Sequence, residues 1–208
     1  MIVIFDLDYT LLDTKAFKEG IVAAISAHGP SIEEVREAQE GAMNRNPDGT
    51  GYYDPDLHIR LLLHRFVDKR IADDAREAIE DVIRHTDEYL YPGAADLLHR
   101  LHAKGIKLVL ITFGNKQFQM RKVKQSGIDK MFDEVIATLE DKGKVLHKFV
   151  GDEDVVVVND NGVETMAMRE VEPSFRYIVK KGPKGLPENV DLPVVESFEE
   201  VERFILGG

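Results

Sequence analysis

The amino-acid sequence predicts an α/β fold in which helices cover both faces of a parallel sheet, with an all-α helical segment inserted after the first strand. Two observations lead to this prediction. Short apolar runs alternate with amphipathic helical patterns along most of the chain, an order typical of βαβ units. Residues 14–88 instead have helical periodicity and no clear strand. We therefore expect a Rossmann-like three-layer α/β/α core from residues 1–13 and 89–208, and a separate helical domain from residues 14–88.

The predicted strands are short apolar runs. The first, Ile2–Phe5, is too short for a membrane anchor, and it lacks the basic flank and the small-residue cleavage site of a signal peptide. The later strands are expected at Lys107–Ile111, Val155–Val158, Phe175–Val179 and Leu192–Val195.

Capping residues and periodic leucines mark the helices of the core. A helix that begins at Ala94 carries leucines at the spacing of one helix face, and Gly105 is a natural end for it. Ser197 and Glu200 have the spacing of a capping box, so the last helix is expected to begin there. The lysines around Gly182-Pro183 are expected in a loop: Lys180, Lys181 and Lys184.

Similar signals divide the inserted segment. Ser31 and Glu34 form a second capping-box pattern, and Pro55 suits the first position of a helix. The stretch Asn44–Gly51 is rich in turn-forming residues and is expected to be a loop.

Composition excludes several classes of protein. The 208 residues are 43% hydrophobic and 31% charged, which is typical of a folded domain with a buried core. A net charge of −11 repels phosphate backbones and anionic lipids, so we expect neither nucleic acid nor membranes as partners. The chain has no cysteine, which excludes disulfides, thiolate metal sites and cysteine nucleophiles. This composition fits a reducing compartment, and we expect a cytoplasmic location.

Polar residues follow three of the predicted strands. Asp6 and Asp8 come directly after the first strand and begin on the same side of the chain. The second strand leads into Thr112–Asn115, where a hydroxyl and backbone N–H groups at a helix start favour an anion. The third leads into Asn159–Glu164, which is again acidic. Because the carboxyl ends of parallel strands share one edge of the sheet, these residues predict a binding site there.

The aspartates predict a metal ion at that edge. Three close carboxylates, from Asp6, Asp8 and Asp160, would raise one another's pKa and destabilise the fold unless a cation lay among them. Oxygen ligands without cysteine or neighbouring histidine favour a hard cation, and Mg²⁺ is the usual one beside a phosphate. Each aspartate taken alone is also a common turn former or helix N-cap.

These motifs resemble those of the haloacid dehalogenase-like hydrolases. Residues Phe5–Asp13 are similar to the family's first motif, DxDxT, and Thr112 matches the second. Asp160 with Glu164 matches the fourth motif, and a lysine ahead of the third predicted strand matches the third. The resemblance covers the whole chain and implies that residues 14–88 are the family's helical cap.

The resemblance also implies roles for the acidic residues. Asp6 would be the nucleophile that forms an aspartyl-phosphate, and Asp8 the general acid and base. Mg²⁺ would be held by the Asp6 carboxylate, the Asp8 backbone carbonyl and Asp160, with Glu164 nearby or acting through water.

The phosphoryl oxygens would be held by Thr112 and by the backbone at Phe113 and Gly114. A lysine would neutralise the charge that develops during the reaction. Lys142 is preferred for this role, because apolar residues follow it at helical spacing, and Lys144 is the alternative.

The chain departs from the family pattern at several positions. Tyr9 and Asn159 stand where glycine is common, and Glu164 stands where aspartate is common. Asn115 lies further from the second-motif hydroxyl than is usual. These departures leave Asp6, Asp8, Thr112 and Asp160 in place, but put a second acidic metal contact in doubt.

Together these features predict a hydrolase: a Mg²⁺-dependent phosphatase that acts on a small phosphorylated metabolite. Asp8 favours phosphate chemistry within the family, because cleavage of a carbon–halogen bond needs no acid for its leaving group. A phosphomutase with the same residues is one alternative. A non-catalytic relative that binds a metal or a phosphorylated ligand is another.

Overall fold

A computed structural model describes residues 1–45, 51–65, 69–151, 154–182 and 191–207. The chain forms two compact units. Unit 1 consists of Met1–Asp13, Leu90–Phe113 and Gly127–Gly208, and unit 2 of Thr14–Tyr89 and Gly114–Ser126. The predicted domains, residues 1–13 with 89–208 and residues 14–88, stay a prediction, and Gly114–Ser126 is the main segment that the two divisions treat differently.

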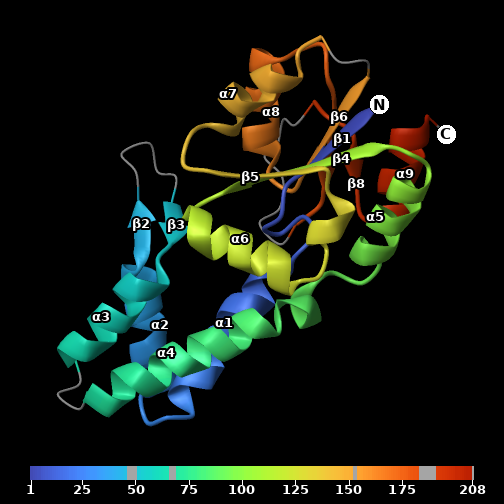
Figure 1. Ribbon diagram of the computed structural model, residues 1–208. Coiled ribbons are helices and arrows are strands. Elements are labelled where there is room, and N and C mark those ends of the chain that lie inside the picture. The colour runs from blue at the N-terminus through green and yellow to red at the C-terminus, as the bar shows by residue number, and fades with distance from the viewer. Residues whose placement is uncertain (46–50, 66–68, 152–153, 183–190, 208) are drawn as a thin grey trace. The chain divides into compact units, whose positions relative to one another are not determined.

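Unit 1 is built on a parallel sheet, which in the described part of the chain has six strands in the order β5-β4-β1-β6-β7-β8 (Figure 1). Their bounds are β1 Ile2–Phe5, β4 Lys107–Phe113, β5 Glu134–Thr138, β6 Val155–Asn159, β7 Arg176–Lys180 and β8 Val194–Val195. The predicted α/β fold with a parallel sheet is confirmed.

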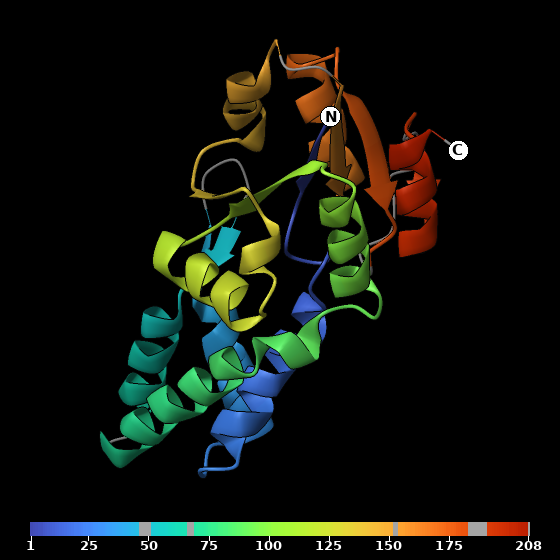
Figure 2. The same ribbon diagram turned by 45° about the vertical axis from the view of Figure 1, so that its right-hand side comes forward.

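Helices cover both faces of this sheet. Helices α5 and α9 pack together on one face, and α7 and α8 pack together on the other (Figures 1 and 2). Their bounds are α5 Ala94–Ala103, α7 Lys142–Leu146, α8 Gly162–Val171 and α9 Phe198–Leu206, with short 3₁₀ helices at Asp129–Met131 and His147–Phe149. These are the three layers of the predicted Rossmann-like core.

Side chains alternate along β1, so its even and odd positions face opposite sides of the sheet and have different neighbours. Ile2 and Ile4 belong to an apolar cluster with Leu146 of α7 and Met168 of α8. Val3 and the other odd position of the strand are fully buried and point to the opposite face. A strand buried on both faces reads as an unbroken apolar run, so it was visible in the sequence.

One strand of the sheet was not predicted. β5 (Glu134–Thr138) is an edge strand whose five residues are all partly exposed, so it lacks a strong apolar run. It is placed by backbone pairing with β4 and by Asp133, whose carboxylate accepts a hydrogen bond from the Leu108 N–H at 2.8 Å. Edge strands carry weak sequence signals because only part of their surface is buried.

The lysine cluster near the end of the sheet needs a correction. Lys180 was expected in a loop, but it is the last residue of β7 and is 6% exposed. Its ammonium lies 4.2 Å from the ring centroid of Tyr91 and 4.9 Å from that of Phe198. Aromatic rings can accommodate a partly buried cation, which a reading of charge alone does not anticipate. Lys184 lies outside the described residues.

Unit 2 is mainly helical. Its apolar cluster is formed by residues from each of the longer helices, with Phe17, Ile79 and Phe118 among them. The bounds are α1 Thr14–Ser26, α2 Ile32–Gly41, α3 Pro55–Arg65, α4 Lys69–Arg84 and α6 Lys116–Gln125, with a 3₁₀ helix at Thr86–Tyr89. The capping box of Ser31 and Glu34 is present, and Pro55 begins α3 as predicted.

The expectation that this segment contains no strand is wrong in one place. A two-stranded antiparallel sheet joins β2 (Met43–Arg45) to β3 (Gly51–Tyr53). Strands of three residues are too short to show a period. The turn-forming residues of Asn44–Gly51 therefore led to the prediction of a loop. Residues 46–50 of that predicted loop lie outside the described residues.

A buried histidine ties β3 to two helices. The Nε2 atom of His58 lies 3.1 Å from the Val35 carbonyl oxygen, so it must donate, and Nδ1 then accepts from the Tyr53 hydroxyl at 2.7 Å. Burial lowers the pKa of His58 to about 4, so its ring is neutral at pH 7.

None of the described helices combines the length and the apolar character needed to cross a membrane.

Candidate active site

The carboxyl edge of the unit 1 sheet brings together most of the predicted site residues. Phe5 of β1 pairs with Leu110 of β4 on one side and with Val158 of β6 on the other. The next residue along β1 is Asp6, whose N–H donates to the Val158 carbonyl at 3.0 Å. Thr112 lies near the end of β4, and Asp160 of the fourth motif follows β6 directly. The register therefore sets the side chains predicted for catalysis at one edge.

A tight turn follows Asp6. The Leu7 carbonyl accepts hydrogen bonds from the N–H groups of the three residues at 10–12, and Tyr9 N–H donates to the Leu12 carbonyl at 2.9 Å. Tyr9 has φ of 64°, in the left-handed region that glycine adopts most readily. The conformation explains why glycine would suit this position, and Tyr9 adopts it at a cost of about 1–2 kcal/mol. Asp8 lies inside the turn and is half-buried.

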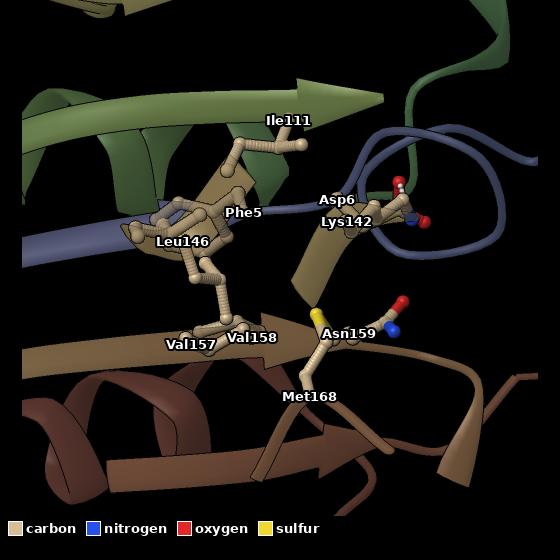
Figure 3. A pocket seen from close by; sticks show the side chains of 10 residues that line it. Phe5, Asp6, Ile111, Lys142, Leu146, Val157, Val158, Asn159 and Met168 are labelled. Atoms are coloured by element: carbon tan, nitrogen blue, oxygen red, sulfur yellow. Dashed lines mark hydrogen bonds and ion pairs between the residues drawn. The ribbon is translucent and has the colours of Figure 1, made fainter. Parts of the chain in front are cut away.

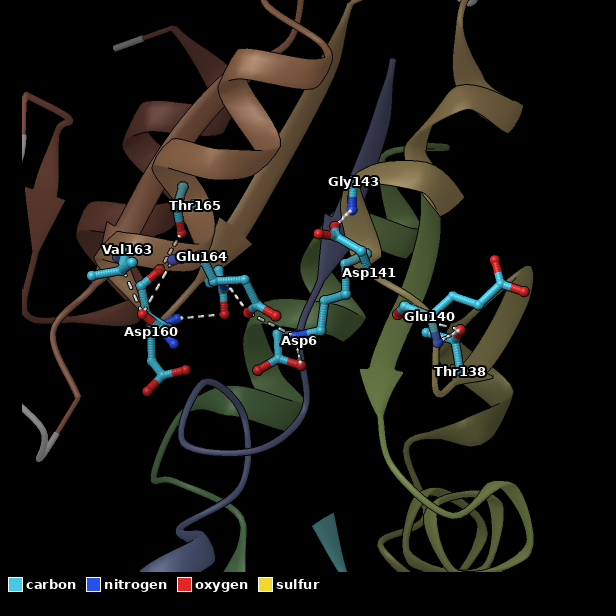
Figure 4. A network of polar contacts seen from close by, with 12 residues as sticks. Asp6, Thr138, Glu140, Asp141, Gly143, Asp160, Val163, Glu164 and Thr165 are labelled. Atoms are coloured by element: carbon cyan, nitrogen blue, oxygen red, sulfur yellow. Dashed lines mark hydrogen bonds and ion pairs between the residues drawn. The ribbon is translucent and has the colours of Figure 1, made fainter. Parts of the chain in front are cut away.

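Lys142 contacts the predicted nucleophile. Its Nζ donates to Asp6 Oδ1 at 2.8 Å and to Glu164 Oε2 at 3.0 Å (Figure 4). Helix α7 begins at Lys142 because the Asp141 side chain caps it by accepting a hydrogen bond from the Gly143 N–H. Lys144 is exposed on the same helix. The structure therefore sets Lys142 against Asp6, the predicted nucleophile.

The charges of the site act strongly on one another. Burial raises the pKa of Asp6 to about 7, with Lys142 opposing the rise and the carboxylates of Glu164, Asp160 and Asp8 adding to it. Burial alone would lower the pKa of Lys142, but Asp6 and Glu164 outweigh burial and raise it. The ammonium is therefore charged, and negative charge is crowded around Asp6.

The Thr112 side chain carries a buried hydroxyl that has no hydrogen-bond partner among the described residues. The whole side chain is fully buried. Phe113 ends β4 and is half-buried, and Gly114 follows with φ of 138°, a conformation that favours glycine. An unpaired buried hydroxyl costs free energy, so its presence at this edge points to a ligand oxygen.

Asp160 and Glu164 differ in their surroundings. Asp160 is 6% exposed, and a Cβ atom at Gly182 would lie 3.0 Å from its Oδ2 atom, so only glycine leaves the carboxylate undisturbed. Glu164 lies in the first turn of α8, where its Oε2 atom accepts from Lys142 and, at 2.8 Å, from Asn159 Nδ2 (Figure 4). The two acidic residues therefore have different partners.

The donor set at this edge fits Mg²⁺. Two buried carboxylates, Asp6 and Asp160, lie near enough for each charge to act on the other. The described residues hold no group of three or more histidine, aspartate or glutamate side chains gathered as a metal site. Mg²⁺ suits such a sparse set, because it usually takes one or two carboxylates and keeps several waters.

An apolar pocket lies behind the polar groups. It is lined by Asp6, Lys142 and Asn159 at the sheet edge and by apolar side chains of the strands and of α7 and α8 (Figure 3). The apolar lining residues are Ile4, Phe5, Ile111, Leu146, Val157, Val158 and Met168. This lining keeps water from the rear of the Asp6 and Lys142 pair, which strengthens the attraction between their charges.

Sequence reasoning missed the contacts of two residues. Asn159 was noted only as a departure from glycine, and Lys180 only as a loop residue. Both residues lie at strand ends and near acidic residues. Asn159 ends β6, and Lys180 ends β7 directly after Val179, which pairs with Asn159. The position of Asn159 at the end of an apolar run was a usable signal, whereas nothing in the sequence places Tyr91 and Phe198 around Lys180.

Comparison with known proteins agrees with the fold and motifs. The sequence model of the haloacid dehalogenase-like hydrolase family matches residues 1–171. A phosphoglycolate phosphatase of Pseudomonas fluorescens is 25% identical over 210 aligned positions, which cover 96% of this chain but 64% of that protein. The chain thus spans less than two thirds of that relative's length.

Two solved structures share the fold. A protein assigned to the haloacid dehalogenase-like hydrolases, from Burkholderia xenovorans, matches with a TM-score of 0.75 and 20% identity over 97% of this chain and 94% of that chain. The 2-haloacid dehalogenase of Pseudomonas syringae matches with a TM-score of 0.67 and 21% identity over 100% of this chain and 99% of its own. At these identities the similarity shows the architecture alone.

Proposed function

The chain belongs to the haloacid dehalogenase-like hydrolases, and we propose that it is a Mg²⁺-dependent phosphatase that hydrolyses a small phosphorylated metabolite through an aspartyl-phosphate at Asp6. The observation that carries this proposal is the buried Asp6 carboxylate, held at 2.8 Å by Lys142 at the edge where three strands end. A carboxylate positioned in this way can attack phosphorus.

The reaction has two steps. A carboxylate oxygen of Asp6 attacks phosphorus, the bond from phosphorus to the leaving oxygen breaks, and Asp8 gives that oxygen a proton. Asp8 then takes a proton from a water molecule, whose oxygen attacks phosphorus and releases the Asp6 carboxylate. Each step moves one proton to or from Asp8, so the residue returns to its starting state.

Other residues of the edge bind the phosphoryl group. The Thr112 hydroxyl, which has no hydrogen-bond partner among the described residues, is available to a phosphoryl oxygen. The part expected of the backbone at Phe113 and Gly114 stays a prediction. Lys142 neutralises negative charge that develops on the transferred group. Asp6, Asp160 and the Asp8 carbonyl would hold Mg²⁺, which when bound supplies positive charge beside the phosphoryl oxygens.

Asp8 favours phosphate over carbon–halogen chemistry. Phosphate esters of sugars and small acids have alkoxide leaving groups that need a proton, whereas halide leaves without one. Asp8 lies half-buried two residues beyond Asp6, within the turn. The dehalogenase similarity reported above extends to architecture, and the acid at position 8 supports the phosphatase.

A substrate panel tests the proposal. Purified protein with Mg²⁺ should release phosphate from p-nitrophenyl phosphate and from at least one phosphorylated metabolite, with 2-phosphoglycolate included because of the 25% identical relative. Release should stop with EDTA and be absent from Asp6→Asn. Binding of Mg²⁺ without turnover of any phosphoester would contradict the phosphatase and favour a non-catalytic relative, and isomerisation of a sugar phosphate would indicate a mutase.

The leaving group separates the roles of the two aspartates. Asp6→Asn should abolish turnover of every substrate, since no acyl phosphate can form. Asp8→Asn should be as damaging with alkyl phosphates but milder in the first-turnover release of nitrophenolate, which departs without a proton. Equal losses on both kinds of substrate would count against Asp8 as the acid.

A further inference from the structure

We propose that Asn159 is a positioning residue whose side-chain amide holds Glu164 on Lys142, and that Glu164 therefore serves the lysine and is not a ligand of the metal. This inference rests on the proposed function for its kinetic consequences. It assigns a partner to the second acidic residue of the fourth motif, and a role to an asparagine at a position where glycine is common.

Both ends of the Asn159 amide are engaged. Asn159 ends β6 and is 1% exposed. Its Nδ2 donates to Glu164 Oε2 at 2.8 Å, and its Oδ1 accepts from the Asp160 N–H at 3.0 Å. The amide has one orientation only, because turning it over would set its NH₂ against an N–H and its oxygen against a carboxylate.

One oxygen of Glu164 receives two donors. Lys142 Nζ at 3.0 Å and Asn159 Nδ2 at 2.8 Å both bond to Oε2. The side chain of Glu164 is 31% exposed, so it could otherwise turn toward water at little cost in desolvation. The amide of a fully buried neighbour removes this freedom, and charge-assisted hydrogen bonds of this kind are among the stronger ones in proteins.

Glu164 in turn fixes the lysine. Lys142 Nζ lies between two carboxylates, 2.8 Å from Asp6 and 3.0 Å from Glu164. A lysine side chain has several rotatable bonds, and one carboxylate alone holds its ammonium less firmly than two from different elements. The chain of contacts from the Asp160 backbone through Asn159 and Glu164 to Lys142 therefore links the fourth motif to the nucleophile (Figure 4).

The same contacts indicate different roles for the two acidic residues of the fourth motif, Glu164 and Asp160. The Oε2 atom of Glu164 accepts hydrogen bonds from both Lys142 and Asn159, whereas among the hydrogen bonds of the described residues the Asp6 carboxylate accepts from Lys142 at Oδ1 alone. Asp160 is buried and its charge acts on that of Asp6, so it lies where an ion held by Asp6 would be bound. Mg²⁺ binding should thus depend on Asp160 and very little on Glu164.

The two positions at which the fourth motif departs from the family pattern are joined by a hydrogen bond. Glutamate reaches further than aspartate and has one more rotatable bond to restrain, and asparagine supplies a donor that glycine lacks. The pair can be understood as one unit, in which the longer acid and the amide that restrains it belong together.

A double-mutant cycle with metal titration tests the proposal. Asn159→Ala, Glu164→Gln and the double variant are assayed with p-nitrophenyl phosphate, and Mg²⁺ binding to each is measured by isothermal titration calorimetry. We expect kcat to fall about tenfold in each single variant with KM changed less than about twofold, the range typical of outer-shell partners. The double variant should fall no further than Glu164→Gln alone, since Asn159 acts through Glu164.

The metal arm has its own expectation. Mg²⁺ should bind Glu164→Gln and Asn159→Ala with dissociation constants within about threefold of wild type, and Asp160→Asn should lose binding. Asn161→Ser is the matched control from the same loop, because the Asn161 side chain caps α8 by accepting from the Val163 and Glu164 N–H groups, and serine can replace that cap. Its kcat should stay within about twofold of wild type.

Several results would overturn the proposal. Losses that multiply in the double variant would show that Asn159 does not act through Glu164, and Glu164→Gln that loses Mg²⁺ as Asp160→Asn does would make Glu164 a metal ligand. If Asn159→Ala does not fold, Asn159→Gly removes the same donor without adding a charge beside Glu164, and should show the same loss of kcat. If wild type turns over no phosphoester, the proposed function fails, while the calorimetry still decides whether Glu164 belongs to the metal.

Discussion

At the scale of single residues, Thr112 shows how a site can cost stability. Its hydroxyl is buried without a partner among the described residues, at the end of a central strand. Burying an unpaired hydroxyl costs about 1–3 kcal/mol, so the fold would be more stable with an apolar side chain of the same shape. A ligand oxygen would supply the missing partner, which is consistent with a role in phosphate binding.

Thr112→Val should therefore raise stability and lower activity together. We expect the free energy of unfolding to rise by about 1 kcal/mol and kcat/KM for p-nitrophenyl phosphate to fall about tenfold or more. The matched control is Thr165→Val, since the hydroxyl of this equally buried threonine donates to the Asn161 carbonyl at 2.7 Å. That variant should be destabilised, and a destabilised Thr112→Val would contradict the reasoning.

His58 predicts a dependence of stability on pH. Its pKa falls from 6.5 to about 4 on burial, so in the folded chain the ring stays neutral at pH values where the unfolded chain takes up a proton. The unfolded state then binds more protons, and stability is lost as pH falls from about 6.5 to about 4, by about 3 kcal/mol in total. At higher pH this contribution is fully present.

Urea denaturation followed by circular dichroism at several pH values measures this slope. His58→Gln should flatten the slope between about pH 6.5 and 4, whatever it does to stability at neutral pH. His64→Gln, on the exposed side of the same helix α3, should keep the slope of the wild type. An unchanged slope in His58→Gln would mean that the ring takes up its proton in the folded chain as readily as in the unfolded chain.

At the scale of elements, α7 positions Lys142 by packing. The helix has only five residues, and it is anchored by Val145 and Leu146, both buried in the cluster beneath the sheet. A helix this short is marginal without such packing. The apolar pocket already adjoins Leu146, so a smaller side chain there would enlarge it directly behind the ion pair.

Leu146→Ala should cost about 2–5 kcal/mol of unfolding free energy, the range for large-to-small changes in a core. Leu139→Ala is the matched control, because Leu139 precedes the same helix and is 53% exposed, and its cost should stay within about 0.5 kcal/mol. Thermal denaturation of both variants is sufficient. Similar losses in the two would show that α7 is not held by this packing.

Among the elements, the central strands could be predicted from the sequence, whereas the edge strand and the three-residue strands could not. β1, β4 and β6 were predictable because strands buried on both faces are unbroken apolar runs, and polar residues end them. β5 and the pair β2 and β3 were not, because an edge strand and three-residue strands have no period to detect. Their positions depend on hydrogen bonds such as that from Leu108 N–H to Asp133.

Local sequence also fails for contacts that need the third dimension. The spacing of Asp6 and Asp8 was informative, since alternation along a strand is a local rule. The hydrogen bond from Asn159 to Glu164 and the contact of Lys180 with aromatic rings depend on which helix packs on which strand end. Such contacts are set by packing between elements, which one sequence does not reveal.

At the scale of the whole molecule, the excess of negative charge favours binding of the proposed cation. The chain carries a net charge of −11, and the repulsion is concentrated where Glu164, Asp160 and Asp8 raise the pKa of Asp6. A divalent cation bound to the folded chain alone would stabilise it by mass action. The fold and the metal are in this way coupled.

Adding Mg²⁺ should thus raise the melting temperature of the wild type. At a hundredfold excess over its dissociation constant the gain is about 2.7 kcal/mol. Asp160→Asn should show little change with Mg²⁺, while the same concentration of Na⁺, matched in ionic strength, should give no comparable gain in the wild type. An equal shift in wild type and Asp160→Asn would place the ion elsewhere on the acidic surface.

The most direct measurement is to trap the phosphoryl group on the chain. Asp8→Asn can still release nitrophenolate but lacks the base for the second step, so a phosphorylated enzyme should accumulate with p-nitrophenyl phosphate and Mg²⁺. Acid quenching, borohydride reduction and peptide mass spectrometry should find the acyl phosphate at Asp6, reduced to homoserine at that position. A phosphoryl group on another residue, or none while nitrophenolate is released, would contradict Asp6 as the nucleophile.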